Sequence, residues 1–242
     1  MNTFIKKAAA VIAAIMIIGG LIVPETLVYA ADNYYTTSPD RIRSAVLIIG
    51  DSRIAGMMEL SDRVAFNATI GAHWHTGYKT LNTRISIGTK RSTQKALVRA
   101  ILKKYGQCHV VLSATINDID NPDTNDSSQT WWYNKSFFGM RSTMSLLSKV
   151  SVKYKGRTVK PKFYIMGIIQ DEGVSNPAVN SANRKMASAG YQKRYGYKYL
   201  ADIGYSSEEN SYLSDGCHFT TENSIRVFNA IMEGIGKSKW KI

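Results

Sequence analysis

The chain has 242 residues, 44% of them hydrophobic, which is enough for one domain with a substantial core. Its 31 Lys and Arg outnumber its 18 Asp and Glu, so the formal net charge is +13 at pH 7 and anionic partners are favoured. Nucleic acid is the least favoured of these partners, because the sequence carries no helix-turn-helix, zinc-finger or RNA-recognition signature.

The N-terminus is typical of an exported protein. Lys6 and Lys7 precede an apolar run from Ala8 to Val23, and Val28 and Ala30 are small enough for the positions that a signal peptidase reads. The run is short for a membrane-spanning helix, which needs about 20 residues. We therefore predict a signal peptide at residues 1–30, a secreted or cell-surface-associated protein and no stable membrane span after cleavage. An uncleaved anchor is the alternative.

Short apolar runs predict the strands of one domain over residues 44–242, after a polar lead-in at 31–43. The runs lie at 44–50, 63–71, 108–115 and 162–169, with a weaker fifth at 197–203. They are rich in Val, Ile and aromatic residues and are mostly continuous rather than alternating. Continuous apolar strands are typical of a parallel sheet that is covered on both faces.

Helical patterns occupy the intervals between these runs and follow the last one. They lie at 92–105, 131–151, 177–194 and 221–234. The alternation predicts an α/β fold, a three-layer α/β/α sandwich with a mainly parallel sheet of about five strands. In such sheets functional groups lie on the loops that leave the carboxyl ends of the strands.

Two cysteines, Cys108 and Cys217, raise the question of a disulfide in an exported chain. Cys108 begins the third strand, whereas Cys217 is expected near the loop at that strand's far end. Seven residues of strand span about 23 Å, far more than the ~6 Å between the Cα atoms of a disulfide. We predict that they do not pair.

Polar residues at the predicted strand ends carry the elements of acyl transfer. Ser52 follows the first strand, Gly71 the second and Asn117 the third, while Asp215 and His218 precede the last helix. A serine needs a base to remove its proton, and the base needs an acid to orient it. The oxyanion intermediate needs hydrogen-bond donors such as backbone N–H groups and a side-chain amide.

Four motifs resemble the characteristic blocks of the SGNH (GDSL-like) hydrolases, a family of esterases and lipases. They are "IIGDSRIAG", "ATIGAHW", "ATINDID" and "LSDGCHFTTENSIRVFNAI", in the family's order. The resemblance implies a flavodoxin-like fold and ester hydrolysis without a metal or organic cofactor. It implies Ser52 as the nucleophile, His218 as the base and Asp215 as the acid that orients the base. It also implies an oxyanion hole formed by the backbone N–H groups of Ser52 and Gly71 and the side chain of Asn117.

The sequence departs from the family pattern at two positions. Thr115 stands where the third block usually has glycine. Arg53 replaces the leucine of the GDSL name, as happens in secreted bacterial members, and places a positive charge beside the nucleophile.

Substrate-binding candidates are Arg53 and two aromatic residues, Trp74 and Trp131. Trp74 follows the glycine block, and Trp131 follows a polar loop at the start of a predicted helix. Trp131 could stack on a sugar or acyl group, or could pack at the helix start, whereas Trp74 is expected only as a substrate contact. His73 and His75 flank Trp74, but no third ligand is in view, so no metal site is predicted.

Together these features predict a secreted serine esterase that hydrolyses carboxylic esters. Short acyl groups such as acetyl, on carbohydrate or cell-wall glycan, are the expected substrate, and an anionic cell-wall polymer is a further candidate partner. Two alternatives remain open: an O-acyltransferase that uses the same site, and a non-catalytic surface module that binds an anionic polymer.

Overall fold

The computed structural model describes residues 34–70, 74, 87, 91–115, 129–169, 177–200 and 218–242. The predicted signal peptide, residues 1–30, lies outside these ranges. Over the described residues, no helix combines the length and apolar character needed to cross a membrane.

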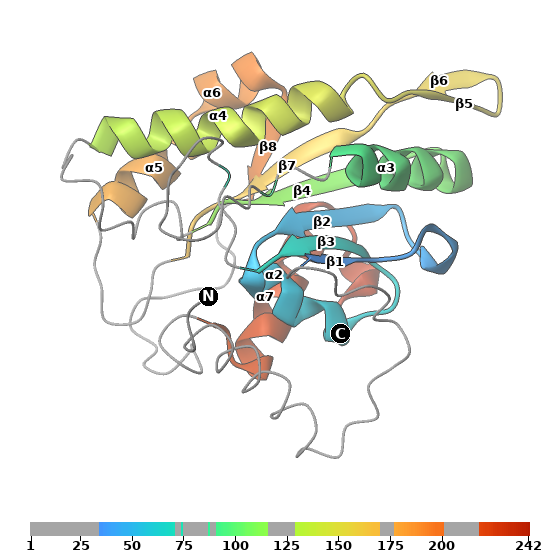
Figure 1. Cartoon of the computed structure of the whole chain (residues 1–242), viewed down its shortest axis with the longest axis horizontal. Coiled ribbons are helices and arrows are strands. Elements are labelled where there is room, and N and C mark those ends of the chain that lie inside the picture. The colour runs from blue at the N-terminus through green and yellow to red at the C-terminus, as the bar shows by residue number, and fades with distance from the viewer. Residues whose placement is uncertain are drawn as a thin grey trace, which may run out of the picture.

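A six-stranded sheet forms the centre of the molecule, in the order β1-β3-β2-β4-β7-β8 (Figure 1). The strands are β1 (Tyr34–Thr36), β2 (Val46–Gly50), β3 (Ala65–Thr69), β4 (His109–Ser113), β7 (Lys162–Met166) and β8 (Tyr197–Leu200). All neighbours pair in parallel except β1, which runs antiparallel to β3. Without β1, the strands follow the order 2-1-3-4-5, which is the flavodoxin-like order. The predicted mainly parallel, flavodoxin-like sheet is therefore confirmed.

The sixth strand, β1, comes from the segment predicted to be a polar lead-in. Tyr34 pairs with Thr69 and Thr36 pairs with Asn67, and the Asn67 side chain donates a hydrogen bond to the Tyr34 hydroxyl. A three-residue strand is too short to show a period. Its pairing with β3 makes it a strand, so its own pattern could not predict it.

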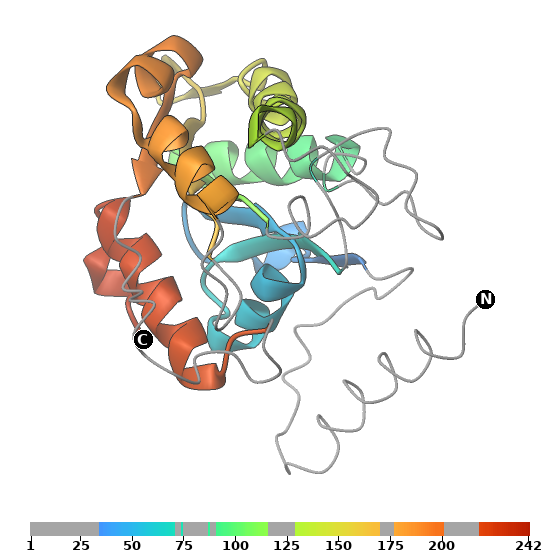
Figure 2. The same ribbon diagram turned by 90° about the vertical axis from the view of Figure 1, so that its left-hand side faces the viewer.

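Helices cover both faces of the sheet (Figure 2). One face carries α3 (Arg91–Tyr105), α4 (Gln129–Leu147), α5 (Pro177–Ala187) and α6 (Ala189–Tyr195), and the other carries α2 (Ser52–Met57) and α7 (Thr221–Gly234). The three-layer sandwich is thus confirmed. The single helix expected at 177–194 is two helices, because Ser188 has extended backbone angles.

A β-hairpin and three short 3-10 helices complete the described elements. The hairpin strands are β5 (Val152–Tyr154) and β6 (Arg157–Val159), and the 3-10 helices are η1 (Pro39–Arg41), η2 (Met58–Leu60) and η4 (Ser238–Trp240). Lys155 and Gly156, between the hairpin strands, both have positive φ angles. The hairpin extends from the C-terminal end of α4, away from the carboxyl edge of the sheet (Figure 1).

The continuous apolar strands bury alternate side chains in two separate cores. In β2, Leu47 and Ile49 face the core under α3 and α4, whereas Val46 and Ile48 face the core under α2 and α7. All four are 0% exposed. Burial on both faces therefore explains the absence of a polar alternation in the sequence.

Cys108 lies buried in the larger core as a free thiol. Burial raises the pKa of this thiol, because the thiolate would lose its solvation there. Cys108 is therefore a packing residue, unpaired as predicted, while Cys217 lies outside the described residues.

Candidate active site

The turn after β2 places a serine at the carboxyl edge of the sheet. β2 ends at Gly50 and α2 begins at Ser52, with Asp51 between them as the N-cap residue. A Cβ at Gly50 would lie 2.3 Å from Ile54 Cγ1 and 2.9 Å from Ser113 Cβ. Any larger residue would push α2 away from β4, so the glycine is needed for the position of Ser52.

His218 faces Ser52 from the segment before α7. Its Nε2 lies 3.1 Å from Ser52 Oγ, a distance at which the hydroxyl can donate a hydrogen bond to the ring nitrogen. The side chain of Thr220 caps α7 by accepting a hydrogen bond from the Asn223 N–H at 3.3 Å. The cap anchors the chain two residues after His218. The structure thus brings together two predicted site residues that are 166 positions apart, in the geometry of a nucleophile and its base.

This pair lies where an α/β sheet of this order binds its ligands. The strand order reverses between the neighbours β2 and β4, and the loops after these two strands leave the same edge. Such a switch point is the usual ligand site of doubly wound sheets. Ser52 follows β2 directly, and Thr115 follows β4.

Solved structures with a similar fold were found, although no family model and no curated protein matches the sequence significantly. Est24, a carbohydrate acetylesterase from Sinorhizobium meliloti, superposes with a TM-score of 0.52 at 14% identity, over 80% of this chain and 98% of Est24. The chain has the α/β fold of the SGNH hydrolases. BT4096, a gut microbial diltiazem-metabolizing enzyme, superposes with a TM-score of 0.50 at 8% identity, over 81% of this chain and 47% of that protein.

Asp51 connects the turn between β2 and α2 to the loop after β4. Its carboxylate accepts hydrogen bonds from the Arg53 N–H at 3.1 Å and from the Thr115 hydroxyl. Thr115 therefore links the two loops of the switch point through its hydroxyl. Sequence reasoning missed this contact. The Asp-Ser pair at a helix start was a signal for the cap, and Thr115 stood out as a departure from glycine, but neither signal indicated a contact between the two residues.

The ionised form of Asp51 is held in an unfavourable environment. The residue is 2% exposed, and burial raises its pKa above the ordinary value, against smaller opposing effects of the Thr115 hydrogen bond and the Arg53 charge. An acid whose pKa is higher in the folded than in the unfolded state binds more protons when folded. Its ionisation therefore costs stability at neutral pH, and the cost disappears as the pH falls below the unfolded value near 4.

Replacing Asp51 with asparagine is expected to preserve or raise the free energy of unfolding at pH 7. The amide oxygen can still accept from the Arg53 N–H, the amide nitrogen can donate to the Thr115 oxygen, and the buried charge is gone. Urea unfolding at pH 7 and pH 4 measures the effect. The stability advantage of Asp51→Asn over the wild type should be smaller at pH 4 than at pH 7. An advantage that is larger at pH 4 than at pH 7 would contradict this assignment.

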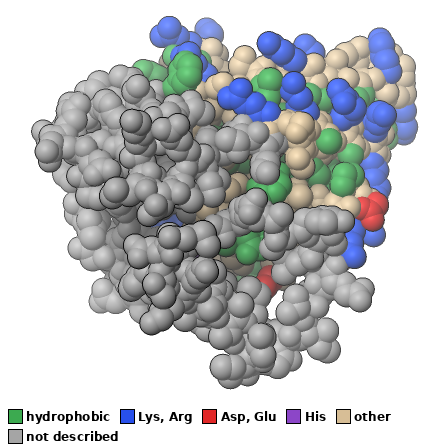
Figure 3. Space-filling model, viewed as in Figure 1, with side chains coloured by type: hydrophobic (Ala, Val, Ile, Leu, Met, Phe, Trp, Pro, Cys, Tyr) green, Lys and Arg blue, Asp and Glu red, His purple; other side chains and the backbone are tan. Residues whose placement is uncertain are grey.

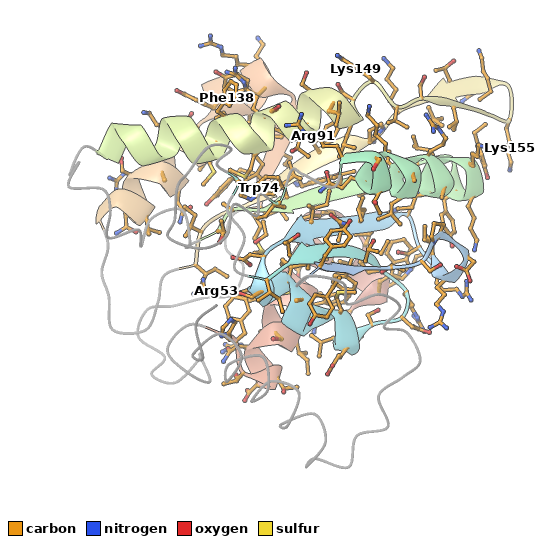
Figure 4. The ribbon with its side chains drawn as sticks, in the orientation of Figure 1. Arg53, Trp74, Arg91, Phe138, Lys149 and Lys155 are labelled. Carbon is orange, nitrogen blue, oxygen red and sulfur yellow. The ribbon has the colours of Figure 1, made fainter. Side chains whose placement is uncertain are left out.

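The Arg53 side chain is buried in the protein rather than exposed on an open binding surface. It is 5% exposed, its guanidinium donates to the Ile169 carbonyl after β7, and it stacks over the Phe219 ring at 5.3 Å from the centroid. Phe219 is the neighbour of His218. Arg53, labelled in Figure 4, therefore joins α2, the loop after β7 and the segment that carries His218, and the substrate contact expected from the sequence stays a prediction.

Trp74 is also a packing residue in this structure. Its side chain is 0% exposed, and its Nε1–H donates to the Ser113 carbonyl at 2.7 Å. It lies beneath α4 (Figure 4), where a Cβ at Gly139 would come within 1.9 Å of the Trp74 carbonyl oxygen. A substrate cannot stack on a fully buried ring, so Trp74 belongs to the core rather than to the substrate surface that the sequence suggested.

The other predicted site residues cannot be placed. Gly71, Asn117 and Asp215 lie outside the described residues, and the side chain of Trp131 is likewise not described. Within the described ranges, no group of three or more His, Cys, Asp and Glu is arranged to hold a metal ion.

Proposed function

We propose that the protein is a serine esterase that removes short acyl groups, above all acetyl, from carbohydrate or cell-wall glycan outside the cell. The observation that carries the proposal is the contact between Ser52 Oγ and His218 Nε2 at 3.1 Å, at the switch point of the sheet. A serine that shares a hydrogen bond with a histidine at this edge can be activated for attack on an ester carbonyl.

The reaction would proceed through an acyl-enzyme. His218 Nε2 takes the proton as Ser52 Oγ attacks the carbonyl carbon, and the proton then passes to the departing alcohol. A water molecule, deprotonated by the same histidine, releases the acyl group as the carboxylic acid. In this proposal Asp215 orients His218, and the backbone N–H groups of Ser52 and Gly71 together with the Asn117 side chain stabilise the oxyanion.

Two further observations support the substrate class. The fold is that of Est24, a carbohydrate acetylesterase, along nearly the whole length of that protein. The predicted signal peptide at residues 1–30 supports an extracellular address, where an acylated glycan would be an accessible substrate. The acetyl and glycan parts of the proposal rest on these two points.

A panel of p-nitrophenyl esters from acetate to palmitate, with acetylated xylan beside it, tests the proposal. We expect kcat/KM for the acetate ester to exceed that for the palmitate ester by at least about tenfold, with acetate released from xylan. The Ser52→Ala variant is the control for contaminating esterases. A preference for the long-chain esters, with no acetate released from glycan, would overturn the substrate class.

A further inference from the structure

Charge is distributed unevenly between the two helical layers. Residues 91–115, 129–169 and 177–200, which form α3 to α6 with β4, β7, β8 and the hairpin, contain 18 Lys and Arg and no Asp or Glu. The acidic residues in the described part of the chain all lie elsewhere, at Asp40, Asp51, Glu59, Asp62, Glu222 and Glu233. In Figure 3 blue side chains lie among green and tan ones over α3, α4 and the hairpin, and the few visible red side chains lie lower in the view.

An open groove of about 320 Å³ lies on this cationic layer, between α4 and the start of α3. Phe138, Arg141 and Ser145 line it from α4, Lys149 lines it from just beyond the end of that helix, and Arg91 lines it from α3. Figure 4 labels Phe138, Lys149 and Arg91. The α4 residues are three or four positions apart, so they form one stripe along the helix. Phe138 and Ser145 are seven positions apart, which corresponds to about 10 Å of helix, and Lys149 lies four positions farther along the chain. The groove is therefore long enough for a chain-like ligand.

Phe138 and Arg141 form a preorganised pair at one end of the groove. Phe138 is 53% exposed, which is unusual for a phenylalanine in a folded domain. The Arg141 guanidinium lies 5.3 Å from the centroid of the Phe138 ring and 5.2 Å from that of Tyr195, and it donates to the Tyr195 hydroxyl at 3.4 Å. Two aromatic rings thus hold Arg141 in place. Less side-chain entropy remains to be lost when it binds an anion.

We propose that this groove binds an anionic polysaccharide, with its carboxylates on Arg141 and Lys149 and a sugar ring on Phe138. An arginine fork matches the geometry of a carboxylate, and the exposed phenyl ring offers an apolar face to the ring of a sugar. A polyol phosphate chain has no ring to place on Phe138. The proposal concerns binding alone and does not depend on the proposed esterase activity.

The β5–β6 hairpin continues this binding surface beyond the groove. Lys149 follows the last turn of α4, and Lys153, Lys155 and Arg157 come next, on the projecting hairpin (Figure 4). A long polyanion that fills the groove would therefore meet further cations in the direction of the hairpin. Binding should strengthen with polymer length, because each added contact is intramolecular once the first is made.

Binding of the mature chain to fluorescently labelled polygalacturonate at 20 mM and 500 mM NaCl tests the proposal. The double variant Arg141→Gln/Lys149→Gln should bind roughly tenfold or more weakly at low salt, and Phe138→Ala should weaken binding at both salt concentrations. The matched control is Arg63→Gln, an exposed arginine next to Asp62 and outside the cationic layer. It should bind as the wild type does.

Several outcomes would overturn the proposal. They are equal losses in Arg63→Gln and the groove variants, unchanged binding in the groove variants, and tighter binding to poly(glycerol phosphate), single-stranded DNA or anionic vesicles than to polygalacturonate. If thermal melting shows that Arg141→Gln/Lys149→Gln is unfolded, a second double variant decides the question. It is Lys149→Gln/Phe138→Ser, which replaces two exposed side chains. Ser52→Ala should bind polygalacturonate normally, so a failure of the esterase proposal and a failure of this one are distinguishable.

Discussion

Replacing Ser52 with alanine is expected to reduce ester hydrolysis by about 10⁴-fold or more while leaving the fold intact. Ser52 Oγ is the atom that faces His218 Nε2 at 3.1 Å. Ser52 is partly exposed and lies in the first turn of α2. Stopped assays with p-nitrophenyl acetate, together with circular dichroism of both proteins, measure the effect.

An exposed serine supplies the matched control for this substitution. Ser148 lies at the end of α4, and its hydroxyl donates to the Ser145 carbonyl. Ser148→Ala should leave kcat/KM within about twofold of the wild type, because surface substitutions rarely act at a distance. Wild-type activity in Ser52→Ala would remove Ser52 from the mechanism.

Replacing Trp74 with alanine should lower the free energy of unfolding by about 3 to 5 kcal/mol. The change leaves a large cavity in the core beneath α4 and removes the hydrogen bond to the Ser113 carbonyl at the end of β4. The loss is comparable to much of the stability of an ordinary domain. Urea unfolding followed by far-UV circular dichroism measures it, and a variant recovered only in the insoluble fraction agrees with the prediction.

Trp74→Phe separates a packing role from a substrate-binding role. Phenylalanine keeps most of the buried area but cannot donate to Ser113, so the expected loss is about 1 to 2 kcal/mol with an unchanged KM for soluble esters. A substrate-binding Trp74 would show the opposite result. KM for acetylated oligosaccharide would rise severalfold, and the unfolding free energy would stay the same.

The fold was largely predictable because its signals are local. The apolar runs of β2, β4 and β7 are continuous since both faces of these strands are buried, and the helical stripes of α3 and α7 match the faces that they bury. Strand β1 could not be predicted, because its three residues are too few to show a period and become a strand only through pairing with β3. The hairpin had a weak signal in Lys155-Gly156, which its turn accommodates with two positive φ angles.

Site residues could be predicted where a motif specifies a chemical group. They could be predicted much less well where a side chain can lie either on the surface or in the core. Ser52 and His218 meet as the motif order suggested. Arg53 and Trp74 look like surface residues in the sequence, since each stands beside a site motif. Their burial depends on partners such as Phe219 and Ser113, which come from distant parts of the chain. Neither composition nor spacing carries that information.

Covalent labelling with a fluorophosphonate probe tests the central claim most directly. An activated serine attacks the phosphorus and displaces fluoride, which leaves a stable adduct on its oxygen. Peptide mapping by mass spectrometry is predicted to find one adduct, on Ser52, and to find it greatly reduced in His218→Ala. No adduct on Ser52, or an adduct that forms equally fast without His218, would contradict the assignment of Ser52 and His218 as nucleophile and base.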